Sequence, residues 1–146
     1  MIKKLYGYDE NPLYHNDIIN MERVYINEAR NTLVGAFDKD NNLIGTIAVR
    51  QYEERIEAIK GIYDAYKTAE LGRCYIKENL RRKGIGSLLF NEIVKFCKNS
   101  EYEIIYLHTH KHLPGGFDFW KKTGFLIKIE ESNEEETVHM EKNILE

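Results

Sequence analysis

The chain has 146 residues, 42% of them hydrophobic, which suits a single domain (residues 1–146) that buries its own core. A formal net charge of −3 argues against a general nucleic-acid-binding protein, which needs a basic surface. No apolar run approaches the ~20 residues of a membrane span, and the N-terminus lacks the apolar stretch of a signal peptide. We therefore expect a cytoplasmic protein with neither nucleic-acid nor membrane partners.

The N-terminal region predicts a short strand and then helix. Residues 2–5 fit a strand. Residues 12–30 fit one or two helices, because Pro12 suits a first helical position after a cap at Asn11. Apolar residues of this segment recur at helical spacing and are expected to pack in the core. They are Ile18, Met21, Tyr25 and Ala29.

A β-hairpin is predicted next. Residues 32–37 and 43–52 fit two antiparallel strands, and residues 38–42 between them are rich in Asp and Asn, which favour turns. Residues 53–67 are charged and fit a helix, a strand or a loop equally well. This segment precedes the central strand, so it either borders a site or is an exposed connection.

The middle of the chain predicts a strand, a helix and a strand. Residues 69–77 fit the central strand and residues 87–98 fit an amphipathic helix. Residues 103–109 contain a continuous apolar run, which is typical of a strand buried on both faces. These three elements should form a right-handed parallel unit.

The C-terminal region predicts a short helix and two strands. Residues 114–122 fit the helix, and Gly124 is expected to cap its end. Residues 125–129 and 137–144 fit the strands, joined by the acidic turn at residues 130–136. The whole chain thus predicts an α+β domain around one mixed sheet.

The turn before the central helix carries the clearest functional pattern, Arg81-Arg82-Lys83-Gly84-Ile85-Gly86-Ser87. Glycines let the backbone approach a ligand closely, and the first N–H groups of a helix have no intrahelical partner. Together with the helix dipole and three basic side chains, this arrangement favours an anion, most often a phosphate. The alternative is a turn whose glycines serve only the turn. The turn matches neither the P-loop nor the dinucleotide fingerprint.

Two motifs in this order resemble those of a known family. Arg81-x-x-Gly84-x-Gly86 resembles the coenzyme-A-binding signature of the GNAT superfamily of acyltransferases. Residues 119–125, Phe-Trp-Lys-Lys-Thr-Gly-Phe, resemble the family's Phe-Tyr-x-Lys-x-Gly-Phe, at the expected distance downstream. The resemblance covers about residues 69–127. It implies the GNAT fold, in which helices flank a mixed, mostly antiparallel central sheet.

The resemblance also implies a reaction and a co-substrate. It implies an N-acetyltransferase that moves an acetyl group from acetyl-CoA directly to a primary amine of a small molecule or peptide, without a covalent enzyme intermediate or a metal. Relatives are often dimers, which leaves a homodimer open. Backbone groups of the turn and of the preceding strand would hold the coenzyme. The residues concerned are Cys74, Tyr75, Ile76, Arg81, Arg82, Lys83, Gly84, Ile85, Gly86 and Ser87.

Acetylation of an amine needs a base, because a Lys-like amine with a pKa near ~10.4 arrives protonated at neutral pH. Glu70 lies at the start of the central strand, where many family members place an acid that works through water. His108 lies on the next strand, where the enzymes that acetylate ribosomal protein N-termini have a glutamate base. A His would titrate in a suitable range. Either residue could instead be a structural or surface group.

One position departs from the family pattern. Trp120 stands where many relatives have a Tyr that protonates the departing thiolate, and an indole N–H cannot release its proton. Either the thiolate is only stabilised, or another group serves, or the protein no longer catalyses. Cys74 and Cys97 form no CxxC pair and are expected to be inert, reduced core thiols. His108, His110 and His112 alternate along a strand, but no Cys or acid nearby completes a metal site.

Two other functional classes stay open. A non-catalytic coenzyme-A-binding sensor or regulatory module would fit the Trp at position 120. A globular interaction domain would require both motifs to be coincidences. Turnover with an amine separates the enzyme from the sensor, and coenzyme binding separates both from the interaction domain.

Overall fold

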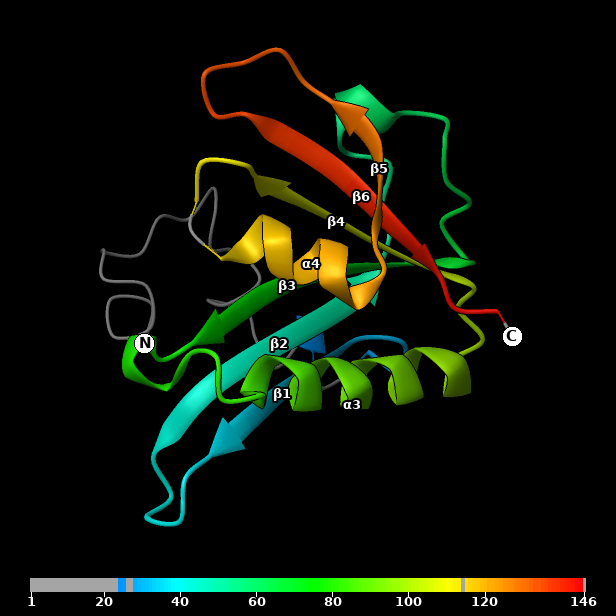
Figure 1. Cartoon of the computed structure of the whole chain (residues 1–146). Coiled ribbons are helices and arrows are strands. Elements are labelled where there is room, and N and C mark those ends of the chain that lie inside the picture. Colours follow the sequence, from blue (N-terminus) through cyan, green and yellow to red (C-terminus); the bar gives the residue numbers. More distant parts are fainter. Residues whose placement is uncertain (1–23, 26–27, 114, 146) are drawn as a thin grey trace. The chain divides into compact units, whose positions relative to one another are not determined.

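The computed structural model of the chain describes residues 24–25, 28–113 and 115–145 (Figure 1). The chain packs into two compact units. The first contains the described residues up to Arg50 together with Gly72–Ile93, and the second contains Gln51–Leu71 and Val94–Glu146. The single domain expected from the chain length stays a prediction.

Six strands form one mixed sheet in the order β1-β2-β3-β4-β6-β5. β1 is antiparallel to β2, β3 is parallel to β4, and β6 is antiparallel to both β4 and β5. This confirms the predicted α+β class and the parallel pairing of the two central strands. The strands are β1 (Thr32–Phe37), β2 (Leu43–Gln51), β3 (Thr68–Ile76), β4 (Ile104–His110), β5 (Leu126–Glu130) and β6 (Thr137–Asn143).

The described helices are α3 (Ile85–Asn99), α4 (Gly116–Thr123) and the short 3-10 helices η2 (Glu57–Ile59) and η3 (Glu78–Leu80). Within the described residues, no helix has the length and apolar character needed to cross a membrane. The predicted strand at residues 2–5 and most of the predicted helix at 12–30 lie outside the described residues. Residues 29 and 30 form a turn, so the predicted helix does not extend to residue 30. Ala29 is exposed there, and its predicted place in the core is wrong.

The first unit is built on the predicted hairpin. The Asp38 carboxylate closes its turn by accepting hydrogen bonds from the N–H groups of Asp40 and Asn42, each at 2.9 Å. These bonds hold the pKa of Asp38 below its usual value, chiefly through the Asn42 N–H. Ile47 on β2 is fully buried, and α3 lies alongside the hairpin in Figure 1. β2 is buried over five consecutive residues, and Leu89 of the helix lies close to Gly45 of this strand.

The second unit contains a cluster of buried aromatic rings. Tyr52, Tyr63 and Tyr106 pack around Ile59, and the Tyr52 ring meets each of the other two edge-on at 5.7 Å between centroids. Edge-to-face contacts suit the charge distribution of aromatic rings. This cluster explains residues 53–67, whose pattern favoured no structure: turns and the short helix η2 carry Ile59 into the core.

Candidate coenzyme and catalytic sites

The glycine-rich turn leads directly into α3. The carbonyl oxygen of Gly84 accepts the first helical hydrogen bond, from the N–H of Leu88 at 3.1 Å. The N–H groups of Ile85, Gly86 and Ser87 precede this bond, so the helix offers them no carbonyl oxygen as an acceptor. The helix begins at Ile85 rather than at residue 87 as predicted, so Gly86 lies inside its first turn.

Gly84 has the backbone conformation that the turn needs and leaves free space beside it. Its φ is +83°, in the left-handed region that favours glycine, and a Cβ built there would meet no atom within 4 Å. Arg82 also has a positive φ, of 66°. The backbone thus has a left-handed conformation twice in three residues, and the space beside Gly84 is open.

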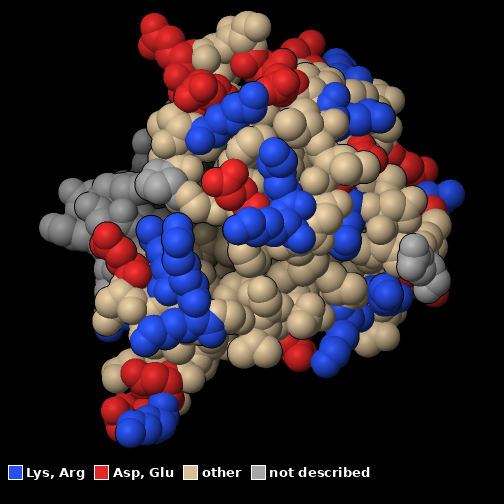
Figure 2. Space-filling model, in the orientation of Figure 1, with Lys and Arg blue, Asp and Glu red and all other residues tan. Residues whose placement is uncertain are grey.

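Basic side chains surround this turn. Arg81, Arg82 and Lys83 are all exposed, and Figure 2 shows basic side chains gathered over the turn before α3. Arg81 Nε donates a hydrogen bond to the carbonyl of Ile76 at 3.3 Å, which ties the turn to the end of β3. Free helical N–H groups and positive side chains together form a site for an anion.

The end of β3 has an irregular backbone beside the turn. Arg73 has a φ of 51°, and its carbonyl accepts a hydrogen bond from the Thr46 hydroxyl at 2.8 Å. The residues that follow, Cys74 to Ile76, are exposed or half-buried. Cys74 is therefore not the core thiol that was predicted, whereas Cys97 is buried as expected. Although Cys74 reaches solvent, the protein around it excludes enough water to raise the pKa of its thiol to about 12.

Glu70 lies in the second unit as a buried carboxylate with one bonded oxygen. Its side chain is 8% exposed, and Oε2 accepts a hydrogen bond from Arg55 Nη2 at 2.5 Å. Oε1 accepts no hydrogen bond from the described residues. A buried polar atom without a partner is unusual and calls for a functional explanation.

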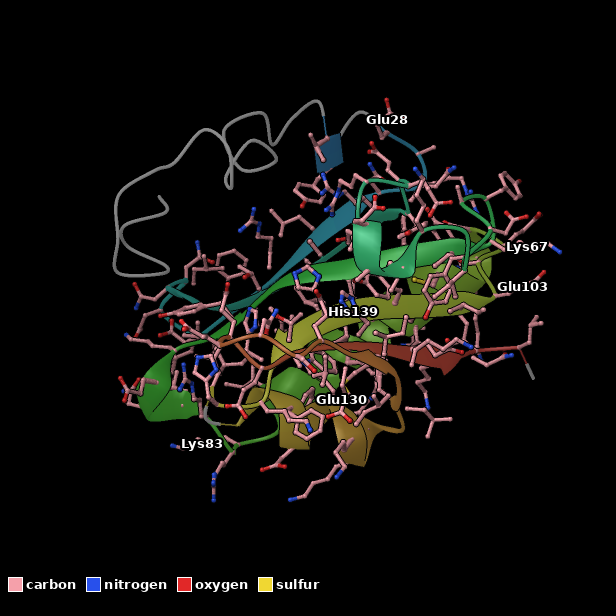
Figure 3. The ribbon with its side chains drawn as sticks, turned by 90° about the horizontal axis from the view of Figure 1, so that it is seen from above. Glu28, Lys67, Lys83, Glu103, Glu130 and His139 are labelled. Carbon is pink, nitrogen blue, oxygen red and sulfur yellow. The ribbon has the colours of Figure 1, made fainter. Side chains whose placement is uncertain are left out.

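A chain of hydrogen bonds begins at the residue paired with Glu70 across β3 and β4. That residue, Tyr106, bonds through its hydroxyl to His139 Nδ1 at 2.7 Å, and His139 Nε2 bonds to Glu131 Oε2 at 2.7 Å. Tyr106 is fully buried, and His139, which Figure 3 labels on β6, is 1% exposed. Burial and the charge of Glu70 both raise the pKa of Tyr106, so its hydroxyl stays protonated.

His108, the second candidate base, lies two residues further along β4. Its side chain reaches solvent, yet loss of water around the ring lowers its pKa to about 4, with smaller contributions from His139 and Arg55. Arg55 thus acts electrostatically on His108 and binds Glu70. The rings of His110 and His112 lie 5.9 Å apart, and no group of three metal-ligating side chains converges anywhere in the described ranges.

The second motif forms the end of α4. Trp120 is 6% exposed and packs edge-on against Phe119 and Phe125, at 4.7 and 5.4 Å between centroids. Gly124 ends the helix with a φ of +105°, and the N–H of Phe125 donates to the carbonyl of Trp120 at 3.0 Å. The glycine is therefore required for the cap, as predicted, and Trp120 contributes to an aromatic core.

Sequence reasoning missed four polar residues near Glu70. Arg55 lay in the segment whose pattern favoured no structure. Tyr106, His139 and Glu131 meet only because β4 and β6 pair in a register that places His108 opposite His139. The one signal in the sequence was the Tyr within the apolar run at the start of β4 and the His between Val138 and Met140 on β6.

Comparison with known proteins identifies the family. The model of the acetyltransferase (GNAT) family matches residues 3–125. The chain belongs to this family. No curated protein matches the sequence. The fold and the GNAT resemblance predicted from the two motifs are thereby confirmed.

Solved structures of acetyltransferases share the fold at low sequence identity. The acetyltransferase of the GNAT family from Staphylococcus aureus Mu50 has a TM-score of 0.75 and 17% identity, covering 99% of this chain and 86% of its own. An aminoglycoside 6'-N-acetyltransferase complexed with coenzyme A has a TM-score of 0.74 and 17% identity, covering 99% and 87%. The PaiA N-acetyltransferase from Thermoplasma acidophilum, in complex with coenzyme A, has a TM-score of 0.63 and 23% identity, covering 97% and 84%.

Proposed function

We propose that this GNAT protein is an N-acetyltransferase that moves the acetyl group of acetyl-CoA directly to a primary amine of a small molecule or peptide. The observation that carries the proposal is the turn at the start of α3. There the N–H groups of Ile85, Gly86 and Ser87 are free of helical bonds, Gly84 leaves open space, and basic side chains are exposed. These features suit the pyrophosphate of coenzyme A.

Neighbouring residues extend the proposed coenzyme site. The backbone of Cys74, Tyr75 and Ile76 would pair with the amide groups of the pantetheine arm, as an exposed strand can pair with an extended ligand. Arg81, Arg82 and Lys83 would neutralise phosphate charge. The thiol of Cys74 takes no chemical part, because its raised pKa keeps it protonated at neutral pH.

We assign the base to Glu70 rather than to His108. The amine arrives as an ammonium ion and gives one proton to Glu70, directly or through a water. A proton on Glu70 leaves Arg55, which is 41% exposed, to be solvated by water, whereas a proton on His108 would add a positive charge that Arg55 and His139 oppose. The neutral nitrogen then attacks the thioester carbon, the carbon–sulfur bond breaks, and the remaining ammonium proton passes to the thiolate.

One observation favours a second candidate, a coenzyme-A-binding module without turnover. Trp120 occupies the position of the usual Tyr acid, and it is buried between Phe119 and Phe125. Such a site lacks the ionisable hydroxyl that relatives place there. We favour the enzyme, because Glu70 keeps an unbonded oxygen to receive a proton.

Calorimetric titration with acetyl-CoA tests the coenzyme site. We expect micromolar binding by the wild type, on the order of −8 kcal/mol, and none by Gly84→Glu, whose carboxylate would meet the phosphates. Turnover is then measured as release of free thiol with spermidine, kanamycin, phosphinothricin and a short peptide with a free N-terminus. Binding without turnover would favour the sensor, and absence of binding would refute both candidates.

A further inference from the structure

The two carboxylate oxygens of Glu70 have different surroundings. Arg55 Nη2 binds Oε2 at 2.5 Å, whereas Oε1 is buried and bonds to none of the described residues. An Arg side chain can bind both oxygens of a carboxylate through its planar fork. Here the guanidinium engages one oxygen only.

The loop that carries Arg55 is anchored on both sides of this residue. On one side, the Glu54 carboxylate accepts hydrogen bonds from the Tyr52 hydroxyl and the Gly61 N–H, each at 3.1 Å. On the other side, Ile56 packs against the cluster that contains Ile59. The backbone at Arg55 is therefore fixed by contacts in which its own side chain takes no part.

We propose that Arg55 is a positioning residue for the reaction: it fixes Glu70 through Oε2 so that Oε1 alone receives the proton of the acceptor amine. This inference rests on the proposed function. In the step concerned, an N–H bond of the ammonium breaks and an O–H bond forms at Oε1. Arg55 stays charged throughout, because a guanidinium does not release its proton in proteins.

The pairing also affects how the acceptor is held. A buried carboxylate without a counter-ion would attract an ammonium ion strongly through its charge alone. With Arg55 in place, the negative charge of Glu70 is already balanced, so the acceptor is held less by charge and its reaction depends more on the orientation of Oε1. Arg55 therefore promotes the rate of the bound complex rather than the binding of the acceptor. As a contact that only stabilises the fold, the pair would contribute little to the free energy of unfolding, because Arg55 is 41% exposed.

A double-mutant cycle tests this role. The variants are Glu70→Gln, Arg55→Gln and the two combined, assayed by thiol release with spermidine, kanamycin, phosphinothricin and the short peptide. We expect kcat to fall about 100-fold in Glu70→Gln and about tenfold in Arg55→Gln, without a rise in the acceptor KM. The double variant should be no slower than Glu70→Gln, because Arg55 acts only through that carboxylate.

Two further variants complete the design. Arg55→Lys keeps a positive charge without the guanidinium and should recover part of the lost kcat, and it replaces Arg55→Gln should that variant fail to fold. Lys67→Gln is the matched control, because Lys67 and Glu103, which lie side by side in Figure 3, form a more exposed pair at 3.9 Å in the same unit. Coenzyme affinity should stay unchanged in every variant.

The outcomes separate this inference from the proposed function. Suppose that the wild type turns over an acceptor. Additive losses of kcat in the double variant, or full kcat in Arg55→Gln, would then overturn the role of Arg55 and leave the proposed reaction standing. Coenzyme binding without turnover of any of the four acceptors would overturn the proposed reaction, and the role of Arg55 with it.

Discussion

The turn before α3 and the Glu70 carboxylate are built from different parts of the chain. At the turn, the proposed coenzyme contacts come from backbone N–H groups, and Gly84 contributes only its lack of a side chain. At Glu70, the proposed chemistry lies in one carboxylate that is bound by Arg55, a residue 15 positions away in the sequence.

The two regions also differ in solvent exposure. Arg81, Arg82 and Lys83 are exposed and can move to meet a ligand. Glu70 is buried, and its charge contributes to raising the pKa of the buried Tyr52 and Tyr106. We therefore expect the turn to tolerate changes of side chain but not of backbone conformation. At Glu70 we expect a change of side chain to be poorly tolerated, because the proposed reaction depends on one carboxylate oxygen.

The largest effect that would sharpen this contrast is expected at Gly84. Gly84→Ala and Gly61→Ala form a matched pair, because both glycines have positive φ values, +83° and +81°, and a Cβ at either would meet no atom within 4 Å. Each substitution should lower the free energy of unfolding by about 1–2 kcal/mol, through backbone strain alone. Only Gly84→Ala should also weaken acetyl-CoA binding, about tenfold, when measured by calorimetry.

The matched pair separates a ligand effect from a fold effect. Equal affinity for acetyl-CoA in both variants would mean that the space beside Gly84 is not used by the coenzyme. A similar loss of affinity in both would mean that general destabilisation, and not the turn, weakens binding.

The turn could be predicted from the sequence because its signals are local. Arg81, Gly84 and Gly86 are neighbours in the chain, and backbone chemistry follows from their order alone. The hairpin and Gly124 were predictable for the same reason, since a turn or a helix cap is decided within a few residues.

The surroundings of Glu70 could not be predicted in this way. Arg55 has no periodic pattern around it, and its contact with Glu70 depends on how the loop folds back over Ile59. The bond between Tyr106 and His139 joins residues 33 positions apart and requires one register of β4 against β6. A shift of one residue would turn every side chain of the strand to the other face, so the sequence alone leaves such contacts undetermined.

An effect on stability alone, without a change in coenzyme binding, is expected from Tyr106→Phe, which probes the buried side of the contrast. The substitution removes the hydroxyl that bonds to His139 Nδ1 at 2.7 Å and leaves a buried ring nitrogen without that partner. The free energy of unfolding should fall by about 1–3 kcal/mol in a urea titration. The control is Tyr52→Phe, whose lost bond is to the exposed Glu54, where water can replace it, so its cost should be smaller. Equal costs would contradict the view that burial makes the difference.

The smallest effect concerns the pH dependence that His108 confers. Loss of water, followed by the charges of His139, Arg55 and His110 and opposed by Glu131, lowers the pKa of His108 from 6.5 to about 4. Between these pH values the unfolded chain binds more protons at this residue than the folded chain does, so acid favours unfolding. The stabilisation is complete above the unfolded pKa and is lost as the pH falls toward 4.

His108→Asn should therefore flatten the fall in unfolding free energy between about pH 7 and about pH 5, measured by urea titration at each pH. The effect is modest because the His108 side chain reaches solvent, which weakens the unfavourable charge interactions at the folded ring. An equal slope in wild type and variant would mean that the ring is hydrated enough to titrate alike in both states. His108 would then be an ordinary surface group, and the argument for Glu70 as the base would rest on its unbonded oxygen alone.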